Sequence, residues 1–220
     1  MRRFEIQLEE LGKALLEMSQ LVEAAIHGSV LSLVELDEAK AQEVLRNEAR
    51  INRMQIEIDD QATRLLALEQ PVAKDLRFIT AAIKINSDLE RMGDEAVNIV
   101  QRAQVLKHEA PLGAPVDMAP MAALAEGMVR KALESFVNRQ PEQARSVLES
   151  DDAVDEWQDK IHGELLNQMR QDPRLVVQGV NLMFVAHSLE RIADHATNIA
   201  EDVLFLVRGI DVRHHAESGA

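Results

Sequence analysis

The stretch LERMGDEAVNI at residues 89–99 returns one hundred residues later as LERIADHATNI at residues 189–199. Seven of the eleven positions are identical, where about one identity is expected by chance. In each copy two acids and an asparagine recur at every fourth residue, so they share one stripe of a helix. The stripes consist of Glu90, Asp94 and Asn98 in the first copy and Glu190, Asp194 and Asn198 in the second. The sequence therefore predicts a duplicated helical unit with an oxygen-rich stripe in each copy.

The composition favours helices and excludes several classes of function. The chain has 220 residues, of which 46% are hydrophobic but only 3% aromatic, as in many helical proteins. Its formal charge of −14 argues against a nucleic-acid binder, which needs basic groups to neutralise phosphates. Cysteine is absent, so a metal would be held by oxygen or imidazole ligands. No apolar run reaches the roughly 20 residues of a membrane span, and the start resembles no signal peptide, so we expect a cytoplasmic protein.

Prolines and turn residues divide the chain into six predicted helices in two sets of three. Asp37 is expected to cap the second helix, and the breaks fall at Gln70-Pro71, at 108–120, at 138–141 and at Asp172-Pro173. The expected helices cover about 8–33, 38–68, 72–106, 120–137, 141–171 and 174–209. We therefore predict an all-α fold with a first unit at 1–108, a linker at 109–117, a second unit at 118–212 and a disordered tail at 213–220.

A second oxygen-rich stripe precedes each break. Glu48 and Asn52 lie four residues apart in the first half, and Asp151 and Asp155 in the second, each about five turns before its proline. Consecutive helices joined by a short turn run antiparallel, so residues equally far from the turn lie level. We therefore expect Glu48 and Asn52 opposite Glu90 and Asp94, and Asp151, Asp155 and Asp159 opposite Glu190 and Asp194.

Together with the segment QPVAKDLR at 70–77 and the three-plus-three helix layout, the two ERxxD segments resemble the PhoU family of bacterial phosphate-signalling regulators. The resemblance covers essentially the whole chain. It implies two pseudo-symmetric three-helix bundles, each with a metal-binding pair of E(D)xxxD motifs, in a protein that forms homodimers. It further implies a negative regulator of the phosphate-starvation response, which connects a phosphate ABC transporter with the sensor histidine kinase of a two-component system. Membrane association would then come only through these partners. Asn52 departs from the pattern, because a carboxylate would complete the first motif. The sequence shows no nucleophile with an organised base and no glycine-rich phosphate loop, so we expect no enzymatic activity.

The chemistry of the stripes suits a divalent cation. Carboxylate and amide oxygens favour Mn, Fe and, more weakly, Mg, while the imidazole of His187, near the second stripe, would favour Fe, Zn or Ni. Plainer interpretations stay open. Acids four residues apart are common on solvated helix surfaces, Asn98 and Asn198 are able to bond neighbouring backbone or helices, and His187 suits a bundle core. Arg91 and Arg191 are expected to form salt bridges, since a guanidinium cannot coordinate a cation.

Lys74 and Arg77 allow two interpretations as well: charges in the first turn of a helix, or a patch that recognises a protein partner. For the whole chain three classes of function remain. The preferred one is the metal-binding regulatory adaptor. The second is a di-metal carboxylate oxidoreductase or iron-binding protein. The stripes lack the Glu-x-x-His spacing of such proteins, which counts against this alternative. The third is a helical scaffold that needs no metal.

Overall fold

The computed structural model describes residues 3–109 and 116–209, which form seven α-helices and one 3₁₀ turn, η1. In chain order the elements are α1 (Arg3–Glu35), α2 (Glu38–Leu68), α3 (Ala73–Leu106), α4 (Ala119–Asn138), α5 (Pro141–Leu148), α6 (Asp151–Gln171), η1 (Pro173–Leu175) and α7 (Val176–Arg208). The predicted all-α fold class is confirmed. Residues 110–115 of the predicted linker and the whole predicted tail, 213–220, lie outside the described residues. None of the helices described is both long and apolar enough to cross a membrane.

The helix ends follow from local side chains. Asp37 caps α2, because its Oδ1 accepts a hydrogen bond of 2.8 Å from the backbone N–H of Ala39. Gln70 takes a left-handed backbone conformation (φ 46°) just before Pro71, and α3 begins two residues after that proline. Asp172 caps η1 in the same way as Asp37 caps α2, with 3.0 Å between its Oδ1 and the N–H of Arg174. The predicted cap and both predicted breaks at proline are therefore present.

The predicted helix from 141 to 171 is interrupted at Glu149 and Ser150, which separate α5 from α6. The hydroxyl of Ser150 donates to the carbonyl of Ser146 at 2.8 Å, a local bond that competes with helical hydrogen bonding. Asp151 and Asp152 then occupy the first turn of α6, where the helix dipole favours negative charge. The break thus places Asp151, a predicted metal ligand, at the very start of a helix.

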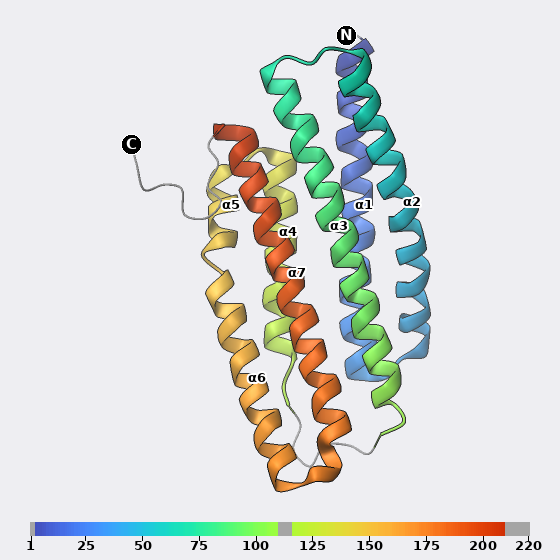
Figure 1. Cartoon of the computed structure of the whole chain (residues 1–220), viewed down its shortest axis with the longest axis vertical. Helices are drawn as coiled ribbons and strands as arrows, with labels where there is room; N and C mark the ends of the chain where they lie inside the picture. The colour runs from blue at the N-terminus through green and yellow to red at the C-terminus, as the bar shows by residue number, and fades with distance from the viewer. Residues whose placement is uncertain (1–2, 110–115, 210–220) are drawn as a thin grey trace.

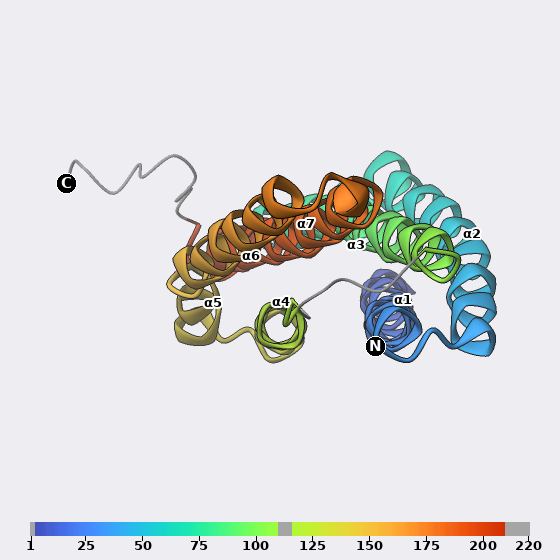
Figure 2. The ribbon, with the colours of Figure 1, turned by 90° about the horizontal axis from the view of Figure 1, so that it is seen from below.

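The helices are arranged in two layers around an antiparallel central pair. Figure 2 shows α2, α3, α7 and α6 as one curved layer, with α1 and α4 beneath it. In the middle of the upper layer α3 and α7 lie side by side and run in opposite directions (Figure 1). Near one end Lys84 Nζ lies 2.7 Å from Asp202 Oδ1, and near the other the guanidinium of Arg102 covers the ring of Phe184. Because positions 84 and 184, and 102 and 202, correspond in the two repeats, a pseudo-two-fold axis passes between α3 and α7.

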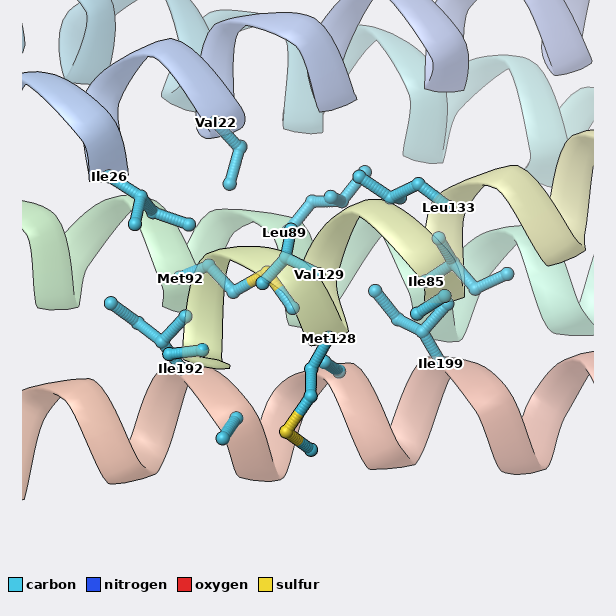
Figure 3. Close-up of a cluster of buried hydrophobic side chains, with 14 of the residues drawn as sticks. Val22, Ile26, Ile85, Leu89, Met92, Met128, Val129, Leu133, Ile192 and Ile199 are labelled. Carbon is cyan, nitrogen blue, oxygen red and sulfur yellow. The ribbon is translucent and has the colours of Figure 1, made fainter. Parts of the chain in front are cut away.

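The two repeats share one apolar core. Its centre is made by large aliphatic side chains of α1, α3, α4 and α7 (Figure 3), each no more than 5% exposed. They include Val22, Ile26, Ile85, Leu89, Met92, Met128, Val129, Leu133, Ile192 and Ile199. Burying one such side chain stabilises the fold by about 1.5–3 kcal/mol. The core therefore fixes α3 against α7 and leaves their outer faces to carry the polar stripes.

Candidate metal centres

The first oxygen-rich group lies between α2 and α3. Burial raises the pKa of Glu90, and the neighbouring charges of Asp94 and Glu48 raise it further, while Arg91 opposes them. The pKa of Asp94 is raised by burial and by Glu48 as well, again against Arg91. On α2 the amide of Asn52 donates to Glu48 Oε1 at 2.5 Å. The structure thus brings the α2 stripe and the α3 stripe together, and their carboxylates repel one another.

The second group lies between α6 and α7. Burial raises the pKa of Asp151, and Asp194 and Asp155 add to the shift. The pKa of Asp194 is raised by burial and by Glu190, and also by Asp155, while His195 lowers it. These four carboxylates therefore face one another across the helix pair, as the corresponding residues do in the first repeat. A carboxylate group under such repulsion has two ways to relax, which are to bind protons or to bind a cation.

The donor sets fit a hard or borderline divalent cation. The first group contains a buried oxygen that receives no hydrogen bond, Oδ1 of Asn52, and in the second group the buried Oε2 of Glu190 has Nδ1 of His187 at 3.2 Å as its neighbour. Such oxygens are costly to bury unless something coordinates them. Across residues 3–109 and 116–209, however, no three Asp, Glu or His side chains are arranged so that they hold an ion as they stand. Closing either group around a cation requires its carboxylates to rotate about their side-chain bonds.

The remaining predicted ligands lie at the edges of these groups. His187 is half exposed, and its Nδ1 lies 3.2 Å from Oε2 of Glu190. Asp159 is exposed on α6 and takes no part in the pKa shifts of the second group. Asn98 donates to Glu95 Oε2 at 3.0 Å, and Asn198 donates to Asp88 Oδ1 at 3.3 Å. Asn198 therefore bonds a neighbouring helix, whereas Asn98 bonds a side chain of its own helix. His187 is the edge residue with a contact to a carboxylate of the second group.

A polar seam between α3 and α7 connects the two groups. Nε of Arg191 lies 2.9 Å from Oε1 of Glu95, which is only 6% exposed, and Nδ1 of His195 lies 2.9 Å from Oδ1 of Asp88. The expected salt bridge of Arg191 is thus confirmed, and Arg91 makes a longer one of 3.8 Å to Glu90. Glu95 and His195 occupy corresponding positions of the two repeats, and each meets a different partner across the seam.

Lys74 and Arg77 lie far along α3 from the carboxylates, near the start of that helix. Both line a hollow that α1, α3, α4 and α7 form together. Lys74 is exposed and Arg77 is partly buried. They therefore belong to a region of the surface separate from the candidate metal centres.

Comparison with known proteins matches this arrangement to one family. The family model described as "PhoU domain" matches twice, at residues 15–103 and 118–203. The chain is 40% identical over 215 residues to the phosphate-specific transport system accessory protein PhoU homolog of Pseudomonas aeruginosa, covering 97% of this chain and 88% of the relative. The homolog of the same name from Aquifex aeolicus is 39% identical over 208 residues, with 94% of each chain covered.

Solved structures agree with the sequence matches. The crystal structure of PhoU from Pseudomonas aeruginosa superposes with a TM-score of 0.90 at 38% identity, and covers 94% of this chain and all of that one. The phosphate transport system regulatory protein PhoU from Streptococcus pneumoniae superposes with a TM-score of 0.86 at 28% identity, covering 96% of this chain and 99% of the other. The similarity extends over both repeats in each case.

Proposed function

The chain belongs to the PhoU family, and on this premise we propose that it is a regulator of phosphate uptake that binds divalent metal at two repeat-related centres. Curated relatives are named accessory proteins of a phosphate-specific transport system, which supports the regulatory role. The observation that carries the metal is the duplicated grouping of mutually repelling carboxylates, once between α2 and α3 and once between α6 and α7. Turnover is not expected, because the proposed output is binding of protein partners.

Glu48, Glu90 and Asp94 would hold the ion of the first centre, with the uncoordinated Oδ1 of Asn52 beside them. In the second centre the ligands would be Asp151, Asp155, Glu190 and Asp194, and His187 is placed to add a nitrogen. A bound cation would neutralise the repulsion among the carboxylates and cross-link neighbouring helices. The mixed donor set of the second centre favours Fe, Mn, Zn or Ni, and the oxygen-only first centre also accommodates Mg.

Metal analysis tests the two centres. Protein purified without chelator is compared with Asp94→Ala, Asp194→Ala and the double variant, using elemental analysis after gel filtration. Asp194→Ala is expected to lose more metal than Asp94→Ala, because Asn52 already leaves the first centre one carboxylate short. Glu57→Ala and Glu164→Ala remove exposed carboxylates from the same helix pairs and serve as matched controls. Full retention of metal by the double variant would refute the assignment, and an oxygen-dependent absorption band of iron-loaded protein would support the oxidoreductase instead.

The regulatory role is tested in a bacterium that lacks its own PhoU-family protein. We propose that the chain acts there as a negative regulator between a phosphate ABC transporter and a sensor histidine kinase. Its expression should restore repression of a phosphate-starvation reporter in phosphate-rich medium. Unchanged reporter activity, with the chain present at a normal level, would contradict this role. The double Asp94→Ala and Asp194→Ala variant in the same assay shows whether repression needs the metal.

Partner contact is proposed for Lys74 and Arg77, which lie apart from the carboxylates. Replacing both with Gln should weaken capture of the transporter's ATPase subunit or of the kinase's cytoplasmic portion, and should leave the metal content unchanged. Unchanged capture of both would remove this patch from the proposal. We further propose that the protein works in the cytoplasm as a homodimer, which sedimentation at micromolar concentration would show as a doubled mass.

A further inference from the structure

A hollow of about 650 Å³ opens between the beginning of α1, the beginning of α3, the end of α4 and the end of α7. Its apolar floor is made by Phe78 and Phe136, whose rings stack with 6.1 Å between their centroids and 12° between their planes. Aliphatic side chains line the walls, and Leu16 is 38% exposed there. Binding sites for small organic molecules usually have volumes of about 300–1,000 Å³ and walls that are mainly apolar. The hollow has the size and surface of such a site.

Four cationic side chains surround this apolar floor. Lys13, Lys74, Arg77 and Arg139 line the hollow against only two acids, Glu9 and Asp75. The excess of positive charge stands out in a chain whose formal charge is −14. In the described part of the chain none of the four cations forms a salt bridge. They are thus available to a negatively charged ligand.

Arg77 gives the clearest sign of a missing partner. Its Nε is buried and has no hydrogen-bond acceptor. A buried donor without an acceptor costs about 1–3 kcal/mol, and more when the group is charged. Arg139 is held differently, because its guanidinium lies 5.9 Å from the centroid of the Phe78 ring. An anion in the hollow would bring a counter-charge to the guanidinium of Arg77 and to the ammonium of Lys74, which both line it.

We propose that this hollow binds a small organic anion, with its phosphate or carboxylate group at Arg77 and Lys74 and its apolar body against Phe78 and Phe136. Inorganic phosphate alone would leave the apolar walls in contact with water. A neutral apolar molecule would leave the cations unused. The apolar floor and the cations around it therefore favour a ligand that has both an apolar body and an anionic group.

The inference uses two residues that the proposed function assigns to partner contact. Its experiment is done on the purified full chain without partners, so the ligand site and partner capture fail or succeed separately. The probe is 8-anilinonaphthalene-1-sulfonate, an organic anion with an apolar body whose fluorescence rises in apolar surroundings. We expect saturable binding of one equivalent, weakened about tenfold or more by Lys74→Gln with Arg77→Gln. Lys131→Gln with Arg170→Gln, which removes two exposed cations elsewhere, should bind as the wild type does.

The variant Gly12→Leu fills the hollow without changing the charged residues around it. The Cβ added at Gly12 would lie an ordinary 3.6 Å from Phe78 Cζ, so the larger side chain extends into the space without clashing at its base. Leucine also favours the helix over glycine, which protects the fold. We expect this variant to melt at or above the wild-type temperature and to lose probe binding. Wild-type binding by Gly12→Leu, or no saturable binding by the wild type, would overturn the proposal.

Competition with the bound probe then tests what kind of apolar body the ligand has. ADP and decanoate are each added to the protein with bound probe, and inorganic phosphate is added as the anion without a body. Displacement by ADP indicates a planar ligand and displacement by decanoate an aliphatic one, and either supports the proposal. Displacement by neither, or equally by inorganic phosphate, would overturn it. The first result would leave the hollow to a protein partner, and the second would make it a simple anion site.

Discussion

Arg191 of α7 and Glu95 of α3 form an ion pair of 2.9 Å across the boundary between the two repeats. The glutamate side chain is 8% exposed, whereas that of the arginine is 45% exposed. Asn98 adds a hydrogen bond of 3.0 Å to the other carboxylate oxygen. A charge buried to this degree depends on its partner, because water can no longer solvate it. The pair therefore makes the packing of one repeat against the other sensitive to a single side chain.

We expect Arg191→Gln to lower the free energy of unfolding by about 2 kcal/mol, since Glu95 would remain buried without its counter-charge. Urea denaturation at pH 7 measures the change. Arg91→Gln is the matched control, because Arg91 is the repeat counterpart and its contact with Glu90 is longer and more exposed. Adding Glu95→Gln to Arg191→Gln should recover most of the loss. If the two arginine substitutions lowered the free energy of unfolding equally, the buried ion pair of the seam would contribute no more than the exposed one.

Glycines of the second repeat offer a test of packing. A Cβ at Gly179 of α7 would lie 2.6 Å from the sulfur and 2.8 Å from Cγ of Met169, so the packed side chain of Met169 on α6 would have to move. We expect Gly179→Ala to destabilise the fold by about 1–2 kcal/mol in spite of its better helix propensity. Gly127→Ala and Gly163→Ala meet no atom within 4 Å and should stabilise it by about 0.5–1 kcal/mol. Thermal melting compares the three, and a stabilised Gly179→Ala would contradict the close contact.

Stability should depend on pH through Glu23, which faces α4 from α1. Burial raises the pKa of this carboxyl above its usual 4.5, and the charges of Glu134 and Glu126 add to the shift, while Arg130 opposes it. His27 lies beside the same group, 3.3 Å from Glu126. The folded chain therefore binds a proton more readily than the unfolded chain above pH 4.5. The stabilisation that comes from protonated Glu23 is complete below pH 4.5, and it is lost as the pH rises through the raised pKa of this carboxyl.

The Glu23→Gln variant should accordingly be more stable than the wild type at pH 7, by about 0.5 kcal/mol for such a partly exposed group. The advantage should shrink as the pH approaches 4.5, because the wild-type side chain becomes neutral too. Urea midpoints measured at pH 7 and pH 5 give this difference, and comparing the variant with the wild type at each pH cancels the contributions of groups that both proteins share. Glu17→Gln changes an exposed acid of the same helix and should show no such trend. An advantage that grows toward low pH would contradict the raised pKa.

Asn52→Asp should reveal the asymmetry of the two centres. The substitution removes the amide that donates to Glu48 and adds a fourth carboxylate to the first group. Without metal the melting temperature should therefore fall, because another like charge enters a partly buried cluster. With manganese in excess it should rise above that of the manganese-loaded wild type, since stronger binding stabilises the folded state. Calorimetric melts with and without MnCl2 measure both, and a variant insensitive to manganese would argue against a metal at this position.

Much of the fold could be predicted because its signals are local. The cap at Asp37 and the breaks at Pro71 and Pro173 depend on side chains within a few residues, and the fourfold spacing of the stripes fixes which faces of α3 and α7 carry acids. Equal distances from a tight turn then place Glu48 beside Glu90. The interruption at Ser150 was missed, because a serine is compatible with a helix until its hydroxyl takes a backbone carbonyl.

The contacts between the repeats could not be predicted in the same way. Whether His195 meets Asp88 depends on the register of α7 against α3, and no turn connects these two helices. The hollow beside Phe78 was missed for the same reason, since its walls come from four helices distant in the sequence. The sequence repeat predicts which residues each copy contains. It does not give the position of the pseudo-two-fold axis that relates the two copies in space.

The opposite directions of α3 and α7 place the first turns of these two helices at opposite poles of the molecule. Each helix covers about 50 Å, so the first turns of the two helices lie that far apart. One pole exposes Val72 and Leu76 beside Lys74, and the other exposes the valines 176, 177 and 180 at the repeat-related place. The two ends thus share exposed apolar side chains next to a cation, Lys74 at one and Arg174 at the other, and they differ in that the charge of Arg174 is neutralised by Asp172 at 2.8 Å.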